Sequence, residues 1–585
     1  TGGSSFSETV ESKISDDAFM VAINGGGLAL STGITCGGGS TSTLNASLLV
    51  NWVRGEDNVG NEALAGPCPL QTDGTRTSDC DITVRPSIHG DVLHSRPAVI
   101  NFGDLDNPGS GTEQDIVLFY GSNDGLFRAV NGNRTRSIGG VRAGGELWSF
   151  VAPEFFPKLQ RQLKNFPRVL FPGSPDTEAE RRDYFFDGNT TFLQDLRTSG
   201  NTAGKVYIFL TPRRGGKFIY AIDVTDPANP GFLWKKSKSD FAEFGQLWST
   251  PQVASIEGYF EEVLVGSETQ RVHKPVLIFG AGYDADVEDL DPMGVDADGN
   301  TVSTDEGRGI VVLDAHTGDL VWAVLNDCSR SSNPTNCVSN PNMTRSFAAD
   351  IKLFDNDFDG HIDRLYAGDT AANIWRVDIP ATFTAASDWS VTKFAQLGGT
   401  GENARKFLFP PEVIPSTHYD LVVAVTGDRE KPLADTRTEA DAPAAVFHVD
   451  NRFYLLIDRD SGSSVAAAPL PVTEPDLLDR TGFRCYDPST TPPSIVACVY
   501  DADDQRYEDS PGGNPLQLVS LTQIRELKDG FYITLEGGSG GTAGDSEGEK
   551  GVNAPVVVAG KVYFATNQPD TSTTSCAANL GIARG

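Results

Sequence analysis

Short runs of apolar residues, separated by turns rich in glycine, aspartate and asparagine, recur along most of the chain. The runs are too short for buried helices and are rich in β-branched and aromatic residues. Both properties are typical of β-strands bounded by tight turns. Examples are the segments 115–120 (DIVLFY), 205–210 (KVYIFL), 309–314 (GIVVLD), 420–426 (DLVVAVT) and 452–458 (RFYLLID).

These strands group into a repeating unit of a strand, a Gly-Asx turn, a second strand and a Gly-x-Leu-x-Trp-like strand. Successive units begin roughly 55 to 90 residues apart, which suits four-stranded blades with insertions of variable length. We therefore expect an all-β fold, a β-propeller of about seven blades with long loop insertions. A set of unrelated β-sandwich domains is the alternative. We also expect residues 420–426 to pair with residues 452–458.

The segment 314–322 (DAHTGDLVW) favours the propeller. Its Asp-x-x-Thr-Gly part predicts a turn with Gly318 at positive φ. The Trp that follows, Trp322, is expected to pack between blades.

Residues 1–90 lack the repeat. We expect them to form an N-terminal extension that packs on the ring or closes it, and residues 91–585 to form the propeller. Within the extension, residues 45–55 (NASLLVNWVRG) have an amphipathic pattern that predicts a helix with Asn45 near its N-cap.

The clearest chemical motif is residues 355–363 (DNDFDGHID). Carboxylates at the first, third, fifth and ninth positions, with glycine at the sixth, match the loop that wraps Ca²⁺ in EF-hands. The seventh residue supplies a backbone carbonyl, and hard oxygen ligands select Ca²⁺ over soft metals. Tyr366 replaces the usual twelfth-position Glu and the flanks are strand-like, so we predict a calcium loop between strands. The predicted ligands are Asp355, Asp357, Asp359, His361 and Asp363.

Other candidate sites are weaker. The acidic segment 284–305 lacks a complete ligand spacing, so a solvated insertion is favoured over a second cation site. The seven histidines include no helical i, i+4 pair, and each is interpreted as structural. A formal GxSxG at 537–541 lies in a Gly/Ser-rich linker, without the strand-turn-helix context of a nucleophile elbow. We therefore expect no catalytic site and no enzyme activity.

The acidic composition limits the kinds of partner that the chain can bind. The chain has 47 Lys and Arg against 79 Asp and Glu, a net charge of −32. Such a surface repels phosphate backbones and anionic lipids, so nucleic acid is excluded as the first choice of partner. No apolar run reaches the ~18 residues of a membrane-spanning helix. The chain begins without a signal-like segment, so we expect cleavage upstream or a piece of a longer protein.

The eight cysteines include no CxxC and no adjacent pair. Three pairs lie close together in polar stretches and predict loop disulfides formed in an oxidising compartment. Reduced, buried thiols are the alternative. The three pairs are Cys68 with Cys80, Cys328 with Cys337, and Cys485 with Cys498; Cys36 and Cys576 remain and could pair.

Several segments together resemble the C-terminal propeller of the PilC/PilY family of type IV pilus tip-associated adhesins. The resemblance is specific because the calcium-type loop directly precedes a Tyr-x-Gly-Asp strand. The matching segments are 94–97 (HSRP), 121–125 (GSNDG), 146–148 (ELW), 246–251 (QLWSTP), 314–322, 355–369 (DNDFDGHIDRLYAGD), 427–432 (GDREKP), 451–454 (NRFY) and 548–566.

The resemblance implies a modified seven-bladed propeller that is exported and carried, extracellularly, at the pilus tip. It implies Ca²⁺ at the 355–363 loop, contacts with minor pilins, and roles in pilus assembly, extension, retraction and twitching motility. Attachment to host or abiotic surfaces is also implied, although no Arg-Gly-Asp occurs. Two alternatives stay open: a quinoprotein-like periplasmic or secreted dehydrogenase, and an assembly scaffold whose calcium is purely structural.

Overall fold

The computed structural model of the chain describes the segments that follow, and the structural statements below concern these residues. The described residues are 34–35, 41–42, 46–55, 85, 88–106, 114–164, 166–170, 179–289, 305–331, 334–416, 418–431, 438–439, 442–446, 449–459, 470–501, 504–511, 514–535, 548–569 and 581–585. Most of the predicted extension, residues 1–90, lies outside them, so that domain boundary stays a prediction.

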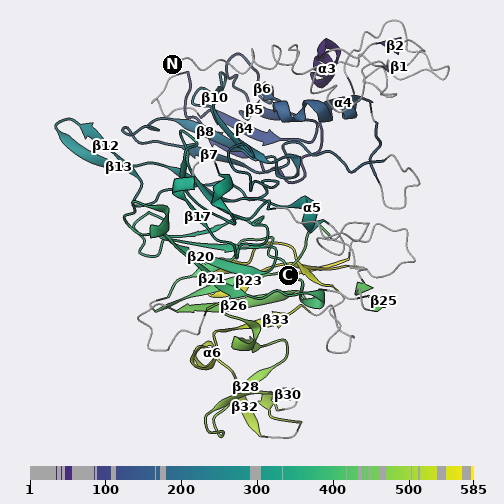
Figure 1. Cartoon of the computed structure of the whole chain (residues 1–585), viewed down its shortest axis with the longest axis vertical. Helices are drawn as coiled ribbons and strands as arrows, with labels where there is room; N and C mark the ends of the chain where they lie inside the picture. The colour runs from purple at the N-terminus through teal and green to yellow at the C-terminus, as the bar shows by residue number, and fades with distance from the viewer. Residues whose placement is uncertain are drawn as a thin grey trace. The chain divides into compact units, whose positions relative to one another are not determined.

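The chain divides into two compact units, each rich in strands (Figure 1). Unit 1 comprises Thr1–Val253, Val263–Val272 and Asp314–Asp319. Unit 2 comprises Ala254–Glu262, His273–Leu313 and Leu320–Gly585.

Unit 1 contains two four-stranded antiparallel sheets in which sequential strands are neighbours. The inner strands of the second sheet are almost wholly buried, which explains the continuous apolar runs in that part of the sequence. The first sheet has β3 (Ala98–Asn101), β4 (Ile116–Gly121), β5 (Phe127–Asn131) and β6 (Glu146–Phe150). The second has β7 (Thr190–Gln194), β8 (Val206–Leu210), β9 (Phe218–Asp223) and β10 (Gly231–Ser237).

Two helices pack in unit 1, α3 (Ala46–Val53) and α4 (Phe156–Lys164). The helix predicted near Asn45 is thus confirmed as α3. Leu49 and Trp52 of α3 are buried in the same hydrophobic cluster as Leu159 of α4.

Unit 2 is built around three sheets, one of four strands and two of five, with the same meander at their centre. The first runs β11 (Gln252–Ala254), β14 (Val276–Gly280), β15 (Gly309–Asp314), β16 (Leu320–Leu325) and β17 (Cys337–Ser339). The second runs β18 (Lys352–Phe354), β19 (Arg364–Gly368), β20 (Asn373–Asp378) and β21 (Ser390–Gln396). The third runs β22 (Glu412–Ile414), β23 (Tyr419–Val425), β26 (Arg452–Arg459), β33 (Gly530–Thr534) and β27 (Leu478–Asp479).

Besides several short 3-10 helices, the described residues form further sheets and two short α-helices. They are β1 (Ile34–Thr35) with β2 (Thr41–Ser42), β12 (Phe260–Val265) with β13 (Glu268–His273), β24 (Thr438–Glu439) with β25 (Ala442–Val446), β35 (Val556–Val558) with β36 (Lys561–Tyr563), β34 (Lys550–Gly551) with β37 (Thr566–Gln568) and β38 (Ile582–Arg584), the sheet of β28 (Arg484–Asp487), β29 (Ser494–Ala497), β30 (Val499–Asp501), β31 (Arg506–Glu508) and β32 (Pro515–Leu518), and helices α5 (Ala285–Glu288) and α6 (Leu521–Leu527).

The antiparallel meander of four strands is the topology of a propeller blade. Five sheets in the described part of the chain are built around it. The predicted pairing of residues 420–426 with 452–458 is confirmed by β23 and β26, where Val422 lies opposite Leu456. The structure therefore confirms the all-β class and the β-propeller fold.

The 314–322 segment forms the turn and the packing that its sequence predicts. The Asp314 carboxylate accepts hydrogen bonds from the backbone N–H groups of His316 (2.8 Å) and Thr317 (2.9 Å), and Gly318 has φ +71°. Trp322 is fully buried and stacks on Trp389, which precedes β21 of the next sheet, with ring centroids 4.4 Å apart. The indole of Trp322 thus joins two neighbouring sheets of unit 2.

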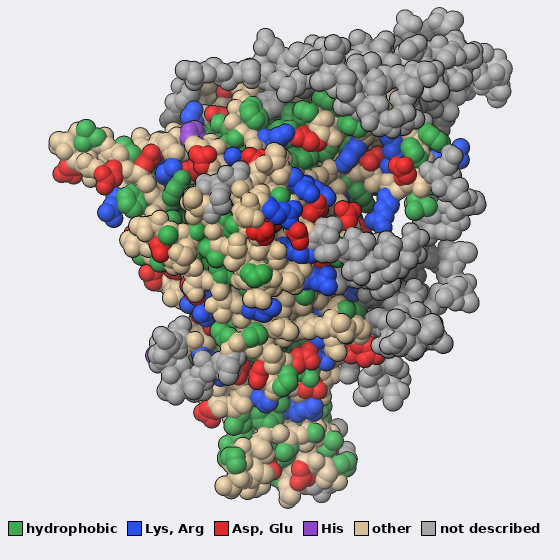
Figure 2. Space-filling model, viewed as in Figure 1, with side chains coloured by type: hydrophobic (Ala, Val, Ile, Leu, Met, Phe, Trp, Pro, Cys, Tyr) green, Lys and Arg blue, Asp and Glu red, His purple; other side chains and the backbone are tan. Residues whose placement is uncertain are grey.

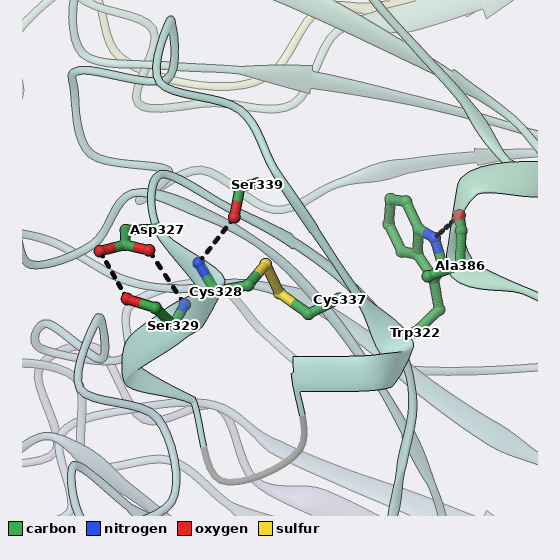
Figure 3. Close-up of a disulfide and its surroundings, with 7 residues drawn as sticks. All are labelled: Trp322, Asp327, Cys328, Ser329, Cys337, Ser339 and Ala386. Carbon is green, nitrogen blue, oxygen red and sulfur yellow. Dashed lines mark hydrogen bonds between the residues drawn. A yellow bond between two sulfur atoms is a disulfide. The ribbon is translucent and has the colours of Figure 1, made fainter.

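Two of the predicted disulfides are present, Cys328–Cys337 and Cys485–Cys498. Figure 3 shows the first, which closes a loop after β16, with the Cys328 N–H donating to Ser339 Oγ at 3.0 Å. Cys36, Cys68, Cys80 and Cys576 lie outside the described residues, so the remaining pairing stays a prediction.

Acidic and basic side chains are interspersed on the face shown in Figure 2. Glu262 and Glu268 of the β12–β13 hairpin are exposed. Among the described residues, no helix combines the length and the apolar character needed to span a bilayer.

Candidate metal centre

The candidate calcium loop connects β18 to β19, two paired antiparallel strands in which Phe354 lies opposite Arg364. The hairpin ends are closed by the Asp363 N–H, which donates to the Phe354 carbonyl at 3.1 Å. Because the flanking strands are held in register by the sheet, the nine loop residues between them must turn within a small volume.

The first three predicted carboxylates converge in this loop. Oxygen atoms of Asp355, Asp357 and Asp359 lie within 4.8 Å of one another. Among the described residues, no lysine, arginine or histidine forms an ion pair with any of these three side chains, and Asp357 and Asp359 are exposed. Repulsion between three such carboxylates is relieved when a divalent cation binds between them.

Backbone N–H groups of the loop hold the carboxylates in place. Gly360 N–H donates to Asp355 Oδ2 at 2.9 Å, and His361 N–H donates to Asp359 Oδ1 at 2.7 Å. Gly360 has φ +94°, and the exposed Phe358 has φ +61°, a conformation that bulky residues rarely adopt. The sequence thus folds into a strained turn that directs its carboxylates to one side.

Asp363 lies at the other end of the loop. Its Oδ2 accepts a hydrogen bond from the Asn356 N–H at 2.8 Å. Partial burial, followed by the negative charges of Asp357, Asp359 and Asp355, raises the pKa of the Asp363 carboxyl above its usual value despite that hydrogen bond. Burial is the largest cause of this rise in the Asp363 pKa, and the three neighbouring carboxylates add to it.

The two remaining positions also have defined environments. The side chain of His361 turns to Ser255 and Glu257, which leaves its backbone carbonyl as the group it can offer to a cation in the loop. Tyr366, at the twelfth position, is fully buried and its hydroxyl donates to Asp458 Oδ2 at 2.7 Å. The donor set is therefore all oxygen, which fits Ca²⁺, and it lacks the bidentate Glu of an EF-hand.

The second acidic segment is only partly described. Oxygen atoms of Asp284, Asp286 and Glu306 lie within 4.8 Å of one another, whereas Asp305 pairs with Arg308 (3.1 Å) and Arg330 (2.5 Å). Residues 290–304, with most of the predicted acidic positions, lie outside the described residues. A second cation site in this segment stays a prediction.

The fold also forms a second cluster that sequence spacing does not reveal. Glu257, His273 and His361 bring ligand-type atoms within 4.8 Å of one another, although they lie far apart in the sequence. The histidines were judged as metal ligands by the i, i+4 spacing of a helical pair. That spacing cannot reveal ligands that come from separate segments of the chain. Only the approach of the 355–363 loop to the β11–β12 connection brings them together.

Fold and loop together define a class: an all-β propeller protein with a loop of converging carboxylates between two strands of one sheet. No protein-family model matches the chain. It is 24% identical over 539 residues to the type IV pilus biogenesis factor PilY1 of Pseudomonas aeruginosa strain UCBPP-PA14, covering 84% of this chain and 38% of that protein. It is 23% identical over 354 residues to a PilY1 homolog of Xylella fastidiosa strain Temecula1, covering 57% of this chain and 23% of that protein.

Solved structures show a weaker likeness. The crystal structure of the Pseudomonas aeruginosa PilY1 C-terminal domain aligns with a TM-score of 0.46 at 18% identity, covering 78% of this chain and 77% of that one. A quinohemoprotein alcohol dehydrogenase from Comamonas testosteroni aligns with a TM-score of 0.29 at 11% identity, covering 77% of this chain and 61% of that one. Because both scores are low, the fold assignment depends on the strand pairing described above.

These matches confirm the resemblance to the C-terminal propeller region of the PilC/PilY family. The chain spans well under half the length of the curated relatives it matches, 38% and 23% for the two named above.

Proposed function

We propose that this chain is the calcium-binding propeller of a type IV pilus biogenesis factor and that it has no enzymatic activity. The similarity to proteins named PilY1 over most of the chain supports the pilus assignment. The observation that carries the calcium assignment is the convergence of Asp355, Asp357 and Asp359 within 4.8 Å, without a described basic partner.

The cation is held by the Asp355, Asp357 and Asp359 carboxylates, the His361 carbonyl and Asp363. The first three supply negative charge at short range, and their orientation is set before binding by the N–H groups of Gly360 and His361. The protein therefore loses little freedom when Ca²⁺ enters, and this favours affinity.

Calcium stabilises one conformation of the β18–β19 hairpin. At a free concentration of one hundred times the Kd, binding adds about 2.7 kcal/mol to the stability of the conformation that binds. A surface beside this hairpin is thereby kept in one state for contact with minor pilins at the pilus tip. The calcium-bound state supports pilus assembly, opposes retraction, and permits adhesion to host or abiotic surfaces outside the cell.

The test uses a piliated bacterium whose own copy is replaced by the full-length protein carrying Asp359→Ala. Asp388→Ala is the matched control, because Asp388 is also an acidic turn residue of unit 2 and its carboxylate accepts only local Thr384 and Ala385 donors among the described residues. We expect the Asp359→Ala strain to carry fewer surface pili than the wild type when the retraction motor is active. Deleting the motor in that strain is expected to restore the pili. Asp388→Ala is expected to match the wild type.

Two results would overturn the proposal. Normal piliation and retraction in Asp359→Ala, together with a calcium-dependent melting temperature in the wild type, would mean that the calcium is purely structural. A bound quinone chromophore in the purified chain, with dye-linked alcohol oxidation, would instead establish a dehydrogenase.

A further inference from the structure

A cluster of two histidines and one glutamate lies next to the calcium-type loop within unit 2. His361 Nε2 is 3.4 Å and His273 Nε2 is 3.6 Å from the same oxygen, Glu257 Oε2. The two imidazole rings meet edge to face with centroids 4.0 Å apart. Three side chains from three separate segments therefore direct ligand atoms toward one point.

The spacing suits a transition-metal ion. Tetrahedral Zn²⁺ with bonds of about 2.0–2.1 Å to nitrogen and oxygen separates its ligand atoms by roughly 3.3–3.4 Å. The two distances from Glu257 Oε2, 3.4 and 3.6 Å, lie close to that separation before any adjustment. Two imidazoles and one carboxylate prefer Zn²⁺ and its first-row neighbours to Ca²⁺ or Mg²⁺.

A second layer of contacts orients one of the ligands. Nδ1 of His361 is 2.9 Å from Ser255 Oγ, so Nε2, the other ring nitrogen, is the one that faces Glu257. The Ile362 N–H also donates to the Ser255 carbonyl at 2.8 Å, which fixes the two segments to each other. A hydrogen bond to the distal nitrogen is the usual way in which proteins position a metal-binding histidine.

Access and local charge also favour a cation. The Glu257 side chain is 41% exposed, while those of His273 and His361 are 23% and 17% exposed, so an ion can enter from solvent. The neighbouring ammonium group of Lys274 donates to the Tyr259 hydroxyl at 2.8 Å and lies over that ring. The Lys274 ammonium group is thus directed to Tyr259.

We propose that Glu257, His273 and His361 bind a divalent transition-metal ion such as Zn²⁺, with the remaining coordination position open to water. This site and the proposed calcium site use different donor atoms. The only shared residue is His361, which offers its ring to one ion and its backbone carbonyl to the other. The bound ion joins the calcium-type loop to the β11–β12 connection and to the end of β13.

The test titrates the full chain, stripped of metals by a chelator, with Zn²⁺ by calorimetry and with Co²⁺ by visible absorption. We expect one high-affinity ion per chain and the intense visible bands of tetrahedral Co²⁺. Glu257→Gln and His273→Ala each remove a ligand and are expected to weaken Zn²⁺ binding at least about 100-fold. Ser255→Ala removes only the orienting contact and is expected to weaken it by about 10–100-fold.

Two controls separate this site from surface histidines and from the calcium loop. His89→Ala, an exposed histidine of unit 1 that contacts Gly90 and Tyr120, is expected to leave Zn²⁺ binding unchanged. Asp357→Asn is expected to lose Ca²⁺ and keep Zn²⁺, while His273→Ala keeps Ca²⁺. Circular dichroism checks that each variant is folded. If His273→Ala does not fold, Glu257→Gln, at a half-buried position, takes its place.

The proposal is overturned if the wild type binds no Zn²⁺ at one ion per chain. It is equally overturned if folded Glu257→Gln binds Zn²⁺ as tightly as the wild type, or if His89→Ala loses as much affinity as His273→Ala. Zn²⁺ and Ca²⁺ binding are measured in separate titrations. Failure of the proposed calcium site would therefore not produce any of these Zn²⁺ results.

Discussion

Strand β19 lies between two aspartate turns that accommodate negative charge in opposite ways. Before the strand, Asp355, Asp357 and Asp359 face one another, and Asp357 and Asp359 are exposed. After it, Asp369 is completely buried. The same residue type is thus placed in two environments that are separated by a single five-residue strand.

In the buried turn, the Asp369 carboxylate accepts hydrogen bonds from uncharged groups of the protein. Asp369 Oδ1 accepts the N–H groups of Ala371 and Asn373, both at 2.9 Å. Its Oδ2 accepts Asn373 Nδ2 at 2.8 Å and Trp375 Nε1 at 2.9 Å. In the exposed turn, backbone N–H groups donate to some carboxylate oxygens of Asp355 and Asp359. Three carboxylates nevertheless lie close together there. The difference indicates that Asp369 is a structural residue, and it supports the proposal that the loop before the strand takes up a cation.

The largest expected effect comes from breaking the buried turn. Asp369→Ala leaves the donors of Asn373 and Trp375 buried without an acceptor, and we expect a loss of about 3–5 kcal/mol in the free energy of unfolding. Asp388→Ala, in an exposed turn of the same unit, is expected to lose less than about 1 kcal/mol. Urea denaturation of the full chain measures both, and equal losses would contradict the assignment of Asp369 as structural.

The next effect concerns the exposed turn and its ion. Saturating Ca²⁺, at one hundred times the Kd, is expected to raise the free energy of unfolding of the wild type by about 2.7 kcal/mol. In Asp359→Ala the increase should vanish, while the calcium-free stability stays close to that of the wild type. Denaturant unfolding with Ca²⁺ and with chelator tests this prediction. A full calcium-dependent increase in the variant would contradict the assignment of Asp359 as a calcium ligand.

The pH dependence of the buried turn gives a smaller effect. Burial raises the pKa of Asp369 above its usual value, although Trp375, Asn373 and Ala371 donate hydrogen bonds that oppose the shift. The stability contributed by its proton is complete below the ordinary carboxyl pKa of about 4 and is lost as the pH rises through the raised value.

Asp369→Asn removes this titration but keeps the size of the side chain. We expect the unfolding free energy of the wild type to fall relative to the variant as the pH rises above about 4, by at most about 1.4 kcal/mol per pH unit, until the raised pKa is passed. Because other titrating groups are shared by both proteins, their contributions cancel in the difference. Parallel stability curves would show that the Asp369 pKa is the same in the folded and unfolded chains.

The smallest expected effect comes from the backbone of the exposed turn. Gly360 has φ +94° and no atom within 4 Å of the position that a Cβ would take, so Gly360→Ala adds only conformational strain, about 1 kcal/mol. Gly231→Ala is the control and should cost less, because Gly231 lies outside the left-handed region and the nearest atom to its Cβ position is 3.8 Å away. Calcium-free denaturation separates the two, and equal stability of both variants would mean that the turn is relaxed.

Much of the fold could be predicted from local pattern. The alternation of apolar runs and turns predicted the strands around Val422 and Leu456, and their pairing is present. The cysteines at 328 and 337 were close enough in sequence to predict their disulfide. Such features depend on residues that are near in the chain, where composition and spacing already constrain the geometry.

The candidate calcium loop was predictable for the same reason, because its acidic residues lie within one turn. The cluster of Glu257, His273 and His361 was not predictable from the sequence. Ser255, which orients the His361 ring, lies 106 positions away from it in the chain. The sequence by itself determined the strand periodicity, the turns and the spacing of Asp355, Asp357 and Asp359. Only the tertiary structure decided which carboxylates are buried with donors and which histidines meet, because burial and long-range proximity arise when the sheets pack.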